Sequence, residues 1–318
     1  MRFFILCSLF LLHSHSAFCF EWEVPWGEIN FEIWRSLKRK DVRIFWWNIQ
    51  YGALSKKTKN AIDRNLIDLI EDPFLRPDLL FLGEIAPYTL KEETQNLLGI
   101  LYPYQKHFPY HSDSKMGIAA FSQIPWNTLR TRPLDWTPNR SSKEKEEYRK
   151  KWEKRAPEKI NHFKKIFIEI SFILKNQIFS VIPVHLLMPW KVIQKQEGTL
   201  ETLKQINSGK EHPLFYQTQR LTSFLKKISN PLVTFGDFNF PKRLFSKTKT
   251  ANLLDFLNPL SLWGNRTFPA LSDPKFLKFP PLKIDHAWSS KEIEIKNGFI
   301  LPLKGSDHYP IVFDLKLY

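Results

Sequence analysis

Short hydrophobic runs recur along the chain, and most of them end at a polar side chain. Runs of this length that are bounded by turn residues indicate buried strands. Strands are therefore predicted at residues 42–47, 78–82, 117–122, 166–172, 178–184, 232–235 and 311–315. Apolar residues spaced three and four apart predict helices at residues 61–70 and 217–228.

The polar residues that close these strands form a series. In α/β sheets, binding and catalytic sites gather where strands end in loops. A single polar residue at a strand end is uninformative. A series of six is hard to attribute to side chains that face solvent by chance. The residues are Asn48, Glu84, His185, Asp237 with Asn239, Asp285 with His286, and Asp307 with His308.

The first residues have the layout of a secretory signal peptide. Arg2 is followed by an apolar run at residues 3–12 and then by small residues up to Cys19. The run is too short to span a bilayer, although a buried N-terminal strand or helix is the alternative. We expect a signal peptide at residues 1–19 and a secreted or periplasmic protein. Both cysteines, Cys7 and Cys19, lie in this segment, which excludes a cysteine nucleophile or cysteine-based zinc site in the mature chain.

Length and charge narrow the class of protein. The 318 residues, 43% of them hydrophobic, are sufficient for one α/β domain, which we place at residues 42–318 after a lead-in at 20–41. The formal net charge of +15 favours polyanionic partners, with nucleic acid first and an anionic membrane surface second. A basic surface that is merely solvated accounts for the charge equally well. No protein partner is inferred.

A basic insertion is predicted at about residues 126–165, with 13 Lys and Arg against 6 Asp and Glu. Ser141 and Glu144 have the spacing of a capping box that opens a helix ending before Pro157. One interpretation is a solvated helical excursion. The other is a basic arm that holds a polyanion, with aromatic side chains for stacking or membrane contact at Trp126, Trp136 and Trp152.

Seven short motifs occur in an order that resembles a known superfamily. They are Trp-Asn-Ile-Gln at 47–50, Leu-Gly-Glu at 82–84, Gly-Ile-Ala-Ala-Phe-Ser at 117–122, Val-His-Leu at 184–186, Gly-Asp-Phe-Asn at 236–239, Ile-Asp-His at 284–286 and Ser-Asp-His-Tyr-Pro at 306–310. The set is similar to the endonuclease/exonuclease/phosphatase superfamily with the DNase I-like fold. The resemblance implies a four-layer α/β sandwich of two packed mixed sheets flanked by helices. It also implies metal-dependent cleavage of phosphoester bonds by a nuclease, a sphingomyelinase or a phosphoinositide phosphatase.

The resemblance implies a divalent metal, usually Mg²⁺, with Mn²⁺ or Ca²⁺ as alternatives. Glu84 is the first expected ligand, with Asn48 beside it and Asp307 as a further ligand. Hard oxygen donors of this kind suit Mg²⁺.

The same resemblance implies the catalytic roles. Asp237 would position or activate water or assist the leaving group, and Asn239 would hold the phosphate. His308 would be the general base or a hydrogen-bond donor in the transition state. Asp285 would orient a histidine, and His185 would donate to a phosphate oxygen.

Each residue alone has a plainer interpretation. Asn48 could cap a strand end, Asp237 with Asn239 could form an Asx turn, and His185 could be a core histidine. His111 lies before the strand at 117–122 and could reach the substrate, although a surface role is the simpler interpretation.

The chain also departs from the family's pattern. Gly83 precedes Glu84 where many members have Gln, and Gln123 stands where Arg or Lys is common. These departures leave the substrate open. The leading hypothesis is a secreted metal-dependent endonuclease. The alternatives are a phospholipase C-type sphingomyelinase or phosphoinositide phosphatase and, third, a non-enzymatic polyanion-binding protein.

Overall fold

The computed structural model describes residues 38–50, 56–86, 89–112, 114–155, 163–187, 212–239, 253–259, 267–268 and 283–318. The predicted signal peptide and nearly all of the lead-in lie outside these residues, so both stay predictions. The described helices are α3 (Lys56–Glu71), α4 (Glu92–Leu101), α5 (Ser142–Arg155) and α9 (Pro213–Leu225). None of these helices is long and apolar enough to cross a membrane.

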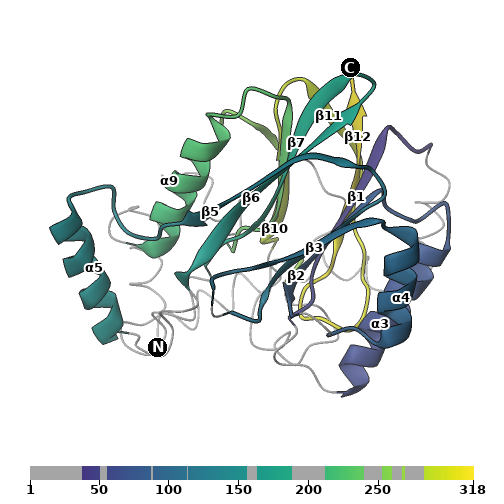
Figure 1. Ribbon diagram of the computed structural model, residues 1–318, viewed down its shortest axis with the longest axis horizontal. Helices are drawn as coiled ribbons and strands as arrows, with labels where there is room; N and C mark the ends of the chain where they lie inside the picture. The colour runs from purple at the N-terminus through teal and green to yellow at the C-terminus, as the bar shows by residue number, and fades with distance from the viewer. Residues whose placement is uncertain are drawn as a thin grey trace, which may run out of the picture.

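The described strands form two mixed sheets of six strands each (Figure 1). The first sheet has the order β11 (Ile293–Ile300), β12 (Ile311–Leu317), β1 (Val42–Asn48), β2 (Leu79–Ile85), β4 (Gly117–Ser122) and β3 (Tyr104–Pro109). The second sheet has the order β5 (Trp126–Leu134), β6 (Lys165–Leu174), β7 (Gln177–His185), β8 (Leu232–Asp237), β10 (Asp285–Ser289) and β9 (Asn258–Pro259). Each sheet has one parallel pair at its centre, β1 with β2 and β7 with β8.

The two sheets pack face to face, and helices cover their outer faces. The rings of Trp46 and Phe81 in the first sheet lie 6.3 and 5.1 Å from that of Phe235 in the second. Helices α3 and α4 bury a second core against the first sheet, and α9 buries a third against the second sheet. Figure 1 shows α3 and α4 on one side of the sheets and α9 on the other. The predicted four-layer α/β sandwich is confirmed.

Burial on both faces explains why the strands read as continuous hydrophobic runs. Every residue of β1 is buried, including Arg43, whose guanidinium Nε lies 2.7 Å from Asp314 Oδ1 on β12. The predicted strand at 117–122 is confirmed to the residue, and the other six are confirmed with shifted ends. The β6–β7 turn lies at Lys175 and Asn176, which both have positive φ, 51° and 62°.

The first part of the predicted basic insertion is a strand of the sandwich. Residues 126–134 are β5, the edge strand of the second sheet next to β6, so this part belongs to the sheet, and the insertion stays a prediction. The predicted capping box is confirmed, because Ser141 N donates to Glu144 Oε2 at 3.1 Å and Glu144 N donates to Ser141 Oγ at 3.4 Å. Helix α5 follows this box directly.

Helix α5 is held to the domain by an aromatic cluster. Tyr148 and Trp152 from the helix pack with Trp136 and Phe163. Trp136 and Trp152 are 7% and 1% exposed. The interpretation of these two tryptophans as stacking or membrane-contact residues is therefore wrong, because their rings fasten α5 to the domain.

His212 adjoins this cluster and begins α9. Its Nδ1 accepts a hydrogen bond from Leu214 N at 3.1 Å, which caps the helix. Its Nε2 is buried without a hydrogen-bond partner. Burial lowers the pKa of His212 to about 3, because the imidazolium would be desolvated.

Acid should therefore destabilise the fold through His212. The unfolded chain protonates this residue near pH 6.5, but the folded chain does so only near pH 3. The stabilisation is complete above pH 6.5 and falls by about 1.4 kcal/mol per unit between those values. Urea unfolding at a series of pH values should show a smaller pH slope for His212→Asn, which keeps a capping acceptor. Equal slopes for the two proteins would contradict the assignment.

Candidate active site

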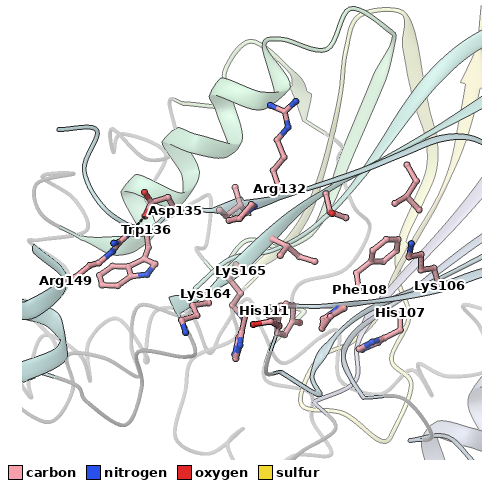
Figure 2. A pocket seen from close by; sticks show the side chains of 18 of the residues that line it. Lys106, His107, Phe108, His111, Arg132, Asp135, Trp136, Arg149, Lys164 and Lys165 are labelled. Carbon is pink, nitrogen blue, oxygen red and sulfur yellow. Dashed lines mark ion pairs between the residues drawn. The ribbon is translucent and has the colours of Figure 1, made fainter. Parts of the chain in front are cut away.

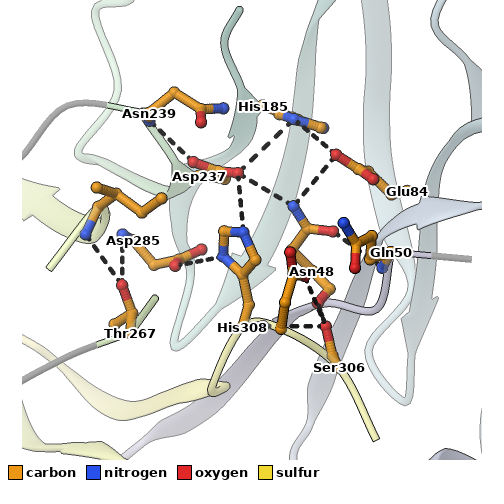
Figure 3. A network of polar contacts seen from close by, with 12 residues as sticks. Asn48, Gln50, Glu84, His185, Asp237, Asn239, Thr267, Asp285, Ser306 and His308 are labelled. Atoms are coloured by element: carbon orange, nitrogen blue, oxygen red, sulfur yellow. Dashed lines mark hydrogen bonds and ion pairs between the residues drawn. The ribbon is translucent and has the colours of Figure 1, made fainter. Parts of the chain in front are cut away.

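The strand arrangement brings the polar strand ends to one edge of both sheets. The two central parallel pairs end at this edge with Asn48 opposite Gly83 and His185 opposite Asp237. Strand β10 runs antiparallel to β8 and starts at the same edge, with Asp285 opposite Asp237. All eight predicted site residues lie here, and Figure 3 labels each of them except Asp307 in one polar network. Their individual roles stay predictions.

A β-bulge directs Glu84 into this network. The register of β2 against β4 shifts between Gly83 and Ile85, and Glu84 has φ of +52°. The backbone N–H of Glu84 leaves the ladder and donates to Tyr110 Oη at 3.1 Å. The carboxylate consequently faces the site with 27% of its side chain exposed.

Gly83 gives room for the indole of Trp46. A Cβ at position 83 would lie 2.7 Å from that ring. The indole Nε1 donates to Asp285 Oδ1 at 2.9 Å. The glycine that departs from the family's pattern therefore permits a bond that fixes one of the site carboxylates.

Asp285 and His308 form a buried pair. His308 Nδ1 lies 2.9 Å from Asp285 Oδ2, and its Nε2 lies 3.8 Å from Asp237 Oδ2. Burial works to lower the pKa of His308, but the carboxylates of Asp285 and then Asp237 raise it overall. Thr267 Oγ1 accepts from Asp285 N at 3.0 Å, which fixes the start of β10.

The two carboxylate oxygens of Asp237 accept hydrogen bonds from different partners. Oδ1 accepts from Asn239 N at 2.8 Å, and Oδ2 accepts from Asn48 Nδ2 at 3.0 Å. The Asx turn considered from the sequence is therefore present, but it uses only Oδ1 and leaves Oδ2 in the site. Burial raises the pKa of Asp237, His308 opposes this, and the charges of Asp285 and Glu84 add to the rise.

Each of the two asparagines is anchored by a hydrogen bond to the backbone. Asn48 Oδ1 accepts from Gln50 N at 3.2 Å, while its Nδ2 also lies 3.5 Å from Glu84 Oε1. Asn239 Nδ2 donates to Leu186 O at 2.8 Å. Asn48 therefore both caps its strand and contacts the carboxylates.

His185 links the two sheets, with help from a tyrosine that the sequence did not indicate. Its Nε2 lies 3.4 Å from Glu84 Oε1 and 3.7 Å from Asp237 Oδ2. Its Nδ1 is hydrogen-bonded to the hydroxyl of Tyr110. Tyr110 follows β3, an exposed edge strand without a hydrophobic run, so the sequence carried only the weak signal of an aromatic residue beside His111.

The C-terminal motif is anchored to β1. Ser306 Oγ donates to Asn48 O at 2.6 Å and accepts from His308 N at 3.1 Å. Trp47 Nε1 donates to His308 O at 2.9 Å. Asp307 is 2% exposed, and its Oδ1 lies 3.5 Å from Ser306 Oγ.

The donor set fits a divalent cation. One atom each of Asp237, Asp285 and His308 lie within 4.8 Å of one another, so this group could hold a metal. The predicted ligands Glu84 and Asn48 lie on the other side of Asp237 (Figure 3). Asp285 and His308 are already bonded to each other. The carboxylate oxygens of Glu84 are therefore the better match for a hard cation, while Asn48 turns its amide nitrogen towards Glu84 and its Oδ1 towards Gln50 N.

Comparison with known proteins identifies the family. The Endonuclease/Exonuclease/phosphatase family model matches residues 45–308. The chain belongs to this family. The predicted resemblance is thereby confirmed, and the site contains the buried acidic and histidine residues that phosphoester cleavage requires. No curated protein sequence matches the chain.

Solved structures with the same fold cover nearly the whole domain. A functionally unknown conserved protein from Enterococcus faecalis V583 has a TM-score of 0.57 at 16% identity, covering 87% of this chain and 100% of its own. An endonuclease/exonuclease/phosphatase family protein from Leptotrichia buccalis has 0.55 at 13%, covering 87% and 100%. Sphingomyelinase C from Streptomyces griseocarneus has 0.56 at 12%, covering 86% and 98%. Identities this low show a shared fold alone.

Removing the Tyr110 hydroxyl should impair catalysis without unfolding the protein. Tyr110→Phe leaves His185 without its Nδ1 partner and the Glu84 bulge without its acceptor. We expect kcat for bis(p-nitrophenyl) phosphate to fall about 10- to 100-fold, the usual cost of losing a supporting hydrogen bond at such a site. Tyr104→Phe at the start of β3, where the ring is exposed, should have wild-type activity. If both variants were equally active, Tyr110 would have no positioning role.

Proposed function

We propose that the protein is a metal-dependent phosphodiesterase that hydrolyses nucleic acid outside the cytoplasm. The observation that supports the reaction is the convergence of Asp237, the Asp285–His308 pair and the Glu84–Asn48–His185 group at one edge. Phosphodiester hydrolysis needs an acceptor for the water proton, donors to the phosphate oxygens and compensation of negative charge. The cluster contains a group for each need.

Asp237 and His308 take complementary roles in the proposed reaction. Water attacks phosphorus, a new P–O bond forms, the bond to the leaving oxygen breaks, Asp237 accepts the water proton, and the leaving oxygen takes up a proton from solvent. His308 lies between two carboxylates, so it is the hydrogen-bond donor of the two alternatives and not the base. The products are a phosphate monoester and an alcohol.

A divalent cation, with Mg²⁺ first, would be held by Glu84, Asn48 and Asp307. When bound, it supplies charge compensation for the phosphate oxygens. The carboxylates of Glu84, Asp237 and Asp285 lie close together, and this excess of negative charge favours cation binding.

Nucleic acid is the proposed substrate because the chain is strongly basic. Its formal net charge is +15, and a polyanion binds through Lys and Arg with strong salt dependence. The lipid alternative calls for exposed aromatic side chains beside the site. Among the described residues, Ile173 and Ile178 are exposed apolar side chains. They flank the β6–β7 turn, at the end of β7 opposite His185, and so lie away from the site. Trp136 and Trp152 are buried.

The activity test compares substrates with and without metal. Purified protein at low salt should cleave DNA or RNA with Mg²⁺, and EDTA should abolish cleavage. His308→Ala should lower kcat about 100-fold or more, since a lost proton-transfer or hydrogen-bonding group typically costs that much. His212→Asn, a histidine change away from the site, should remain active.

Two outcomes would reject this proposal. No metal-dependent cleavage of any nucleic acid at low salt would remove the nuclease assignment. Metal-dependent release of phosphocholine from sphingomyelin liposomes, or of phosphate from phosphoinositides, would establish the lipid alternative in its place. Unchanged activity in His308→Ala would favour the non-enzymatic alternative.

A further inference from the structure

A groove of about 910 Å³ lies between the edge strands of the two sheets, beside the proposed active site. Strand β3 forms one wall and β5 the other, and the segment 164–166 at the start of β6 closes one side. Figure 2 shows the side chains of this β3–β5 groove. The proposed catalytic mechanism uses none of its cationic residues.

The groove lining carries a net positive charge. It has five Lys and Arg residues against Asp135 and Glu153. The Arg132 guanidinium lies over the Phe224 ring of α9 and Arg149 pairs with Asp135, so Lys106, Lys164 and Lys165 are the cations that carry the argument. Figure 2 shows the cations spread from Arg149 and Lys164 near α5 to Lys106 near the far end of β3, with His111 and His107 between them. A row of separated cations matches a polymer with repeating phosphates better than a single lipid headgroup.

The groove has an apolar floor under this row. Phe108, Leu129 and Ile166 belong to or pack against the core between the sheets and also line the groove. Unpaired bases can lie on such an apolar floor, whereas a duplex keeps its bases paired and stacked in its interior. Basic grooves with apolar or aromatic floors are how proteins hold single strands.

One side chain joins the groove to the active site. Lys165, itself only 8% exposed, places its Nζ 4.0 Å from the centroid of the Tyr110 ring. The hydroxyl of that ring is bonded to His185 in the catalytic cluster. A strand that leaves the reaction centre past Tyr110 therefore enters the groove directly.

We propose that the β3–β5 groove binds the single-stranded arm of DNA or RNA that flanks the scissile phosphate. This inference rests on the proposed function and adds to it a preference for single strands. The groove is the specificity-determining surface, and its Lys side chains contact the phosphates that are not cleaved.

Binding is measured separately from cleavage, on the full chain in EDTA. The probe is a fluorescein-labelled thymidine oligonucleotide of about ten nucleotides, within the usual site size, followed by anisotropy over a salt series. Lys106→Gln/Lys164→Gln should weaken binding roughly tenfold at low salt. The negative slope of log K against log salt should become less steep by about 1.4, since each phosphate contact to a single strand contributes about 0.7 to its magnitude and two contacts are lost. The charge-matched control Lys227→Gln/Lys291→Gln, away from the groove, should leave both values unchanged.

Several results would overturn the proposal. These are equal losses in the groove and control variants, tighter binding of the matched duplex than of the strand, or groove-dependent binding of phosphatidylglycerol vesicles in place of the oligonucleotide. Wild-type hydrolysis of bis(p-nitrophenyl) phosphate with Mg²⁺ tests the proposed function independently. If that hydrolysis failed while groove-dependent strand binding held, the catalytic assignment would fall and the groove would stand. The opposite pair of results would reject the groove alone.

Discussion

The structure depends on buried negative charge being compensated across the junction of the two sheets. Asp237 and Asp285 are 1% and 0% exposed, and two carboxylates this close in a dry environment are costly unless each is bonded. Trp46 of the first sheet and His308, in the segment that leads into β12, hold Asp285 of the second sheet. Asn48 of the first sheet holds Asp237 in the same way. The proposed catalytic groups are therefore also polar contacts that join the sheets at this edge.

This arrangement ties the chemistry to the packing of the core. Trp46 packs against Phe235 in the core between the sheets while its indole N–H reaches Asp285. A change in the spacing of the sheets would move Asp285, and His308 would lose its orienting partner. The apolar core beneath the site thus sets the distances within it, in keeping with the general requirement that reacting groups sit on rigid elements.

The convergence of the site side chains could be predicted from the sequence because strand ends are local features. Asn48 and Asp237 each follow a hydrophobic run, and their convergence needed only the assumption of a shared sheet edge. Tyr110 and Thr267 could not be found in this way. Tyr110 follows an exposed edge strand with no hydrophobic pattern, and Thr267 acts through its hydroxyl on the backbone of a distant strand.

The basic segment shows where composition misleads. A count of charges over residues 126–165 averages an edge strand, an aromatic anchor and a charged helix into one feature. The number of charged residues in a segment does not tell whether a tryptophan in it faces a ligand or packs a helix onto the domain, since both kinds of tryptophan occur in basic segments. Trp152 is buried against Phe163, while Lys164 next to that phenylalanine is exposed in the groove.

The shared position of Tyr110 gives the groove a consequence for catalysis. Its ring lies under Lys165 at the groove, and its hydroxyl holds His185 and the Glu84 bulge. Contacts with the non-reacting part of a substrate raise the rate only when they help to form the transition state. A strand bound along the groove would contact the ring of Tyr110, whose hydroxyl orients His185. Binding energy from the phosphates that are not cleaved would then help to orient His185, the group proposed to face the scissile phosphate.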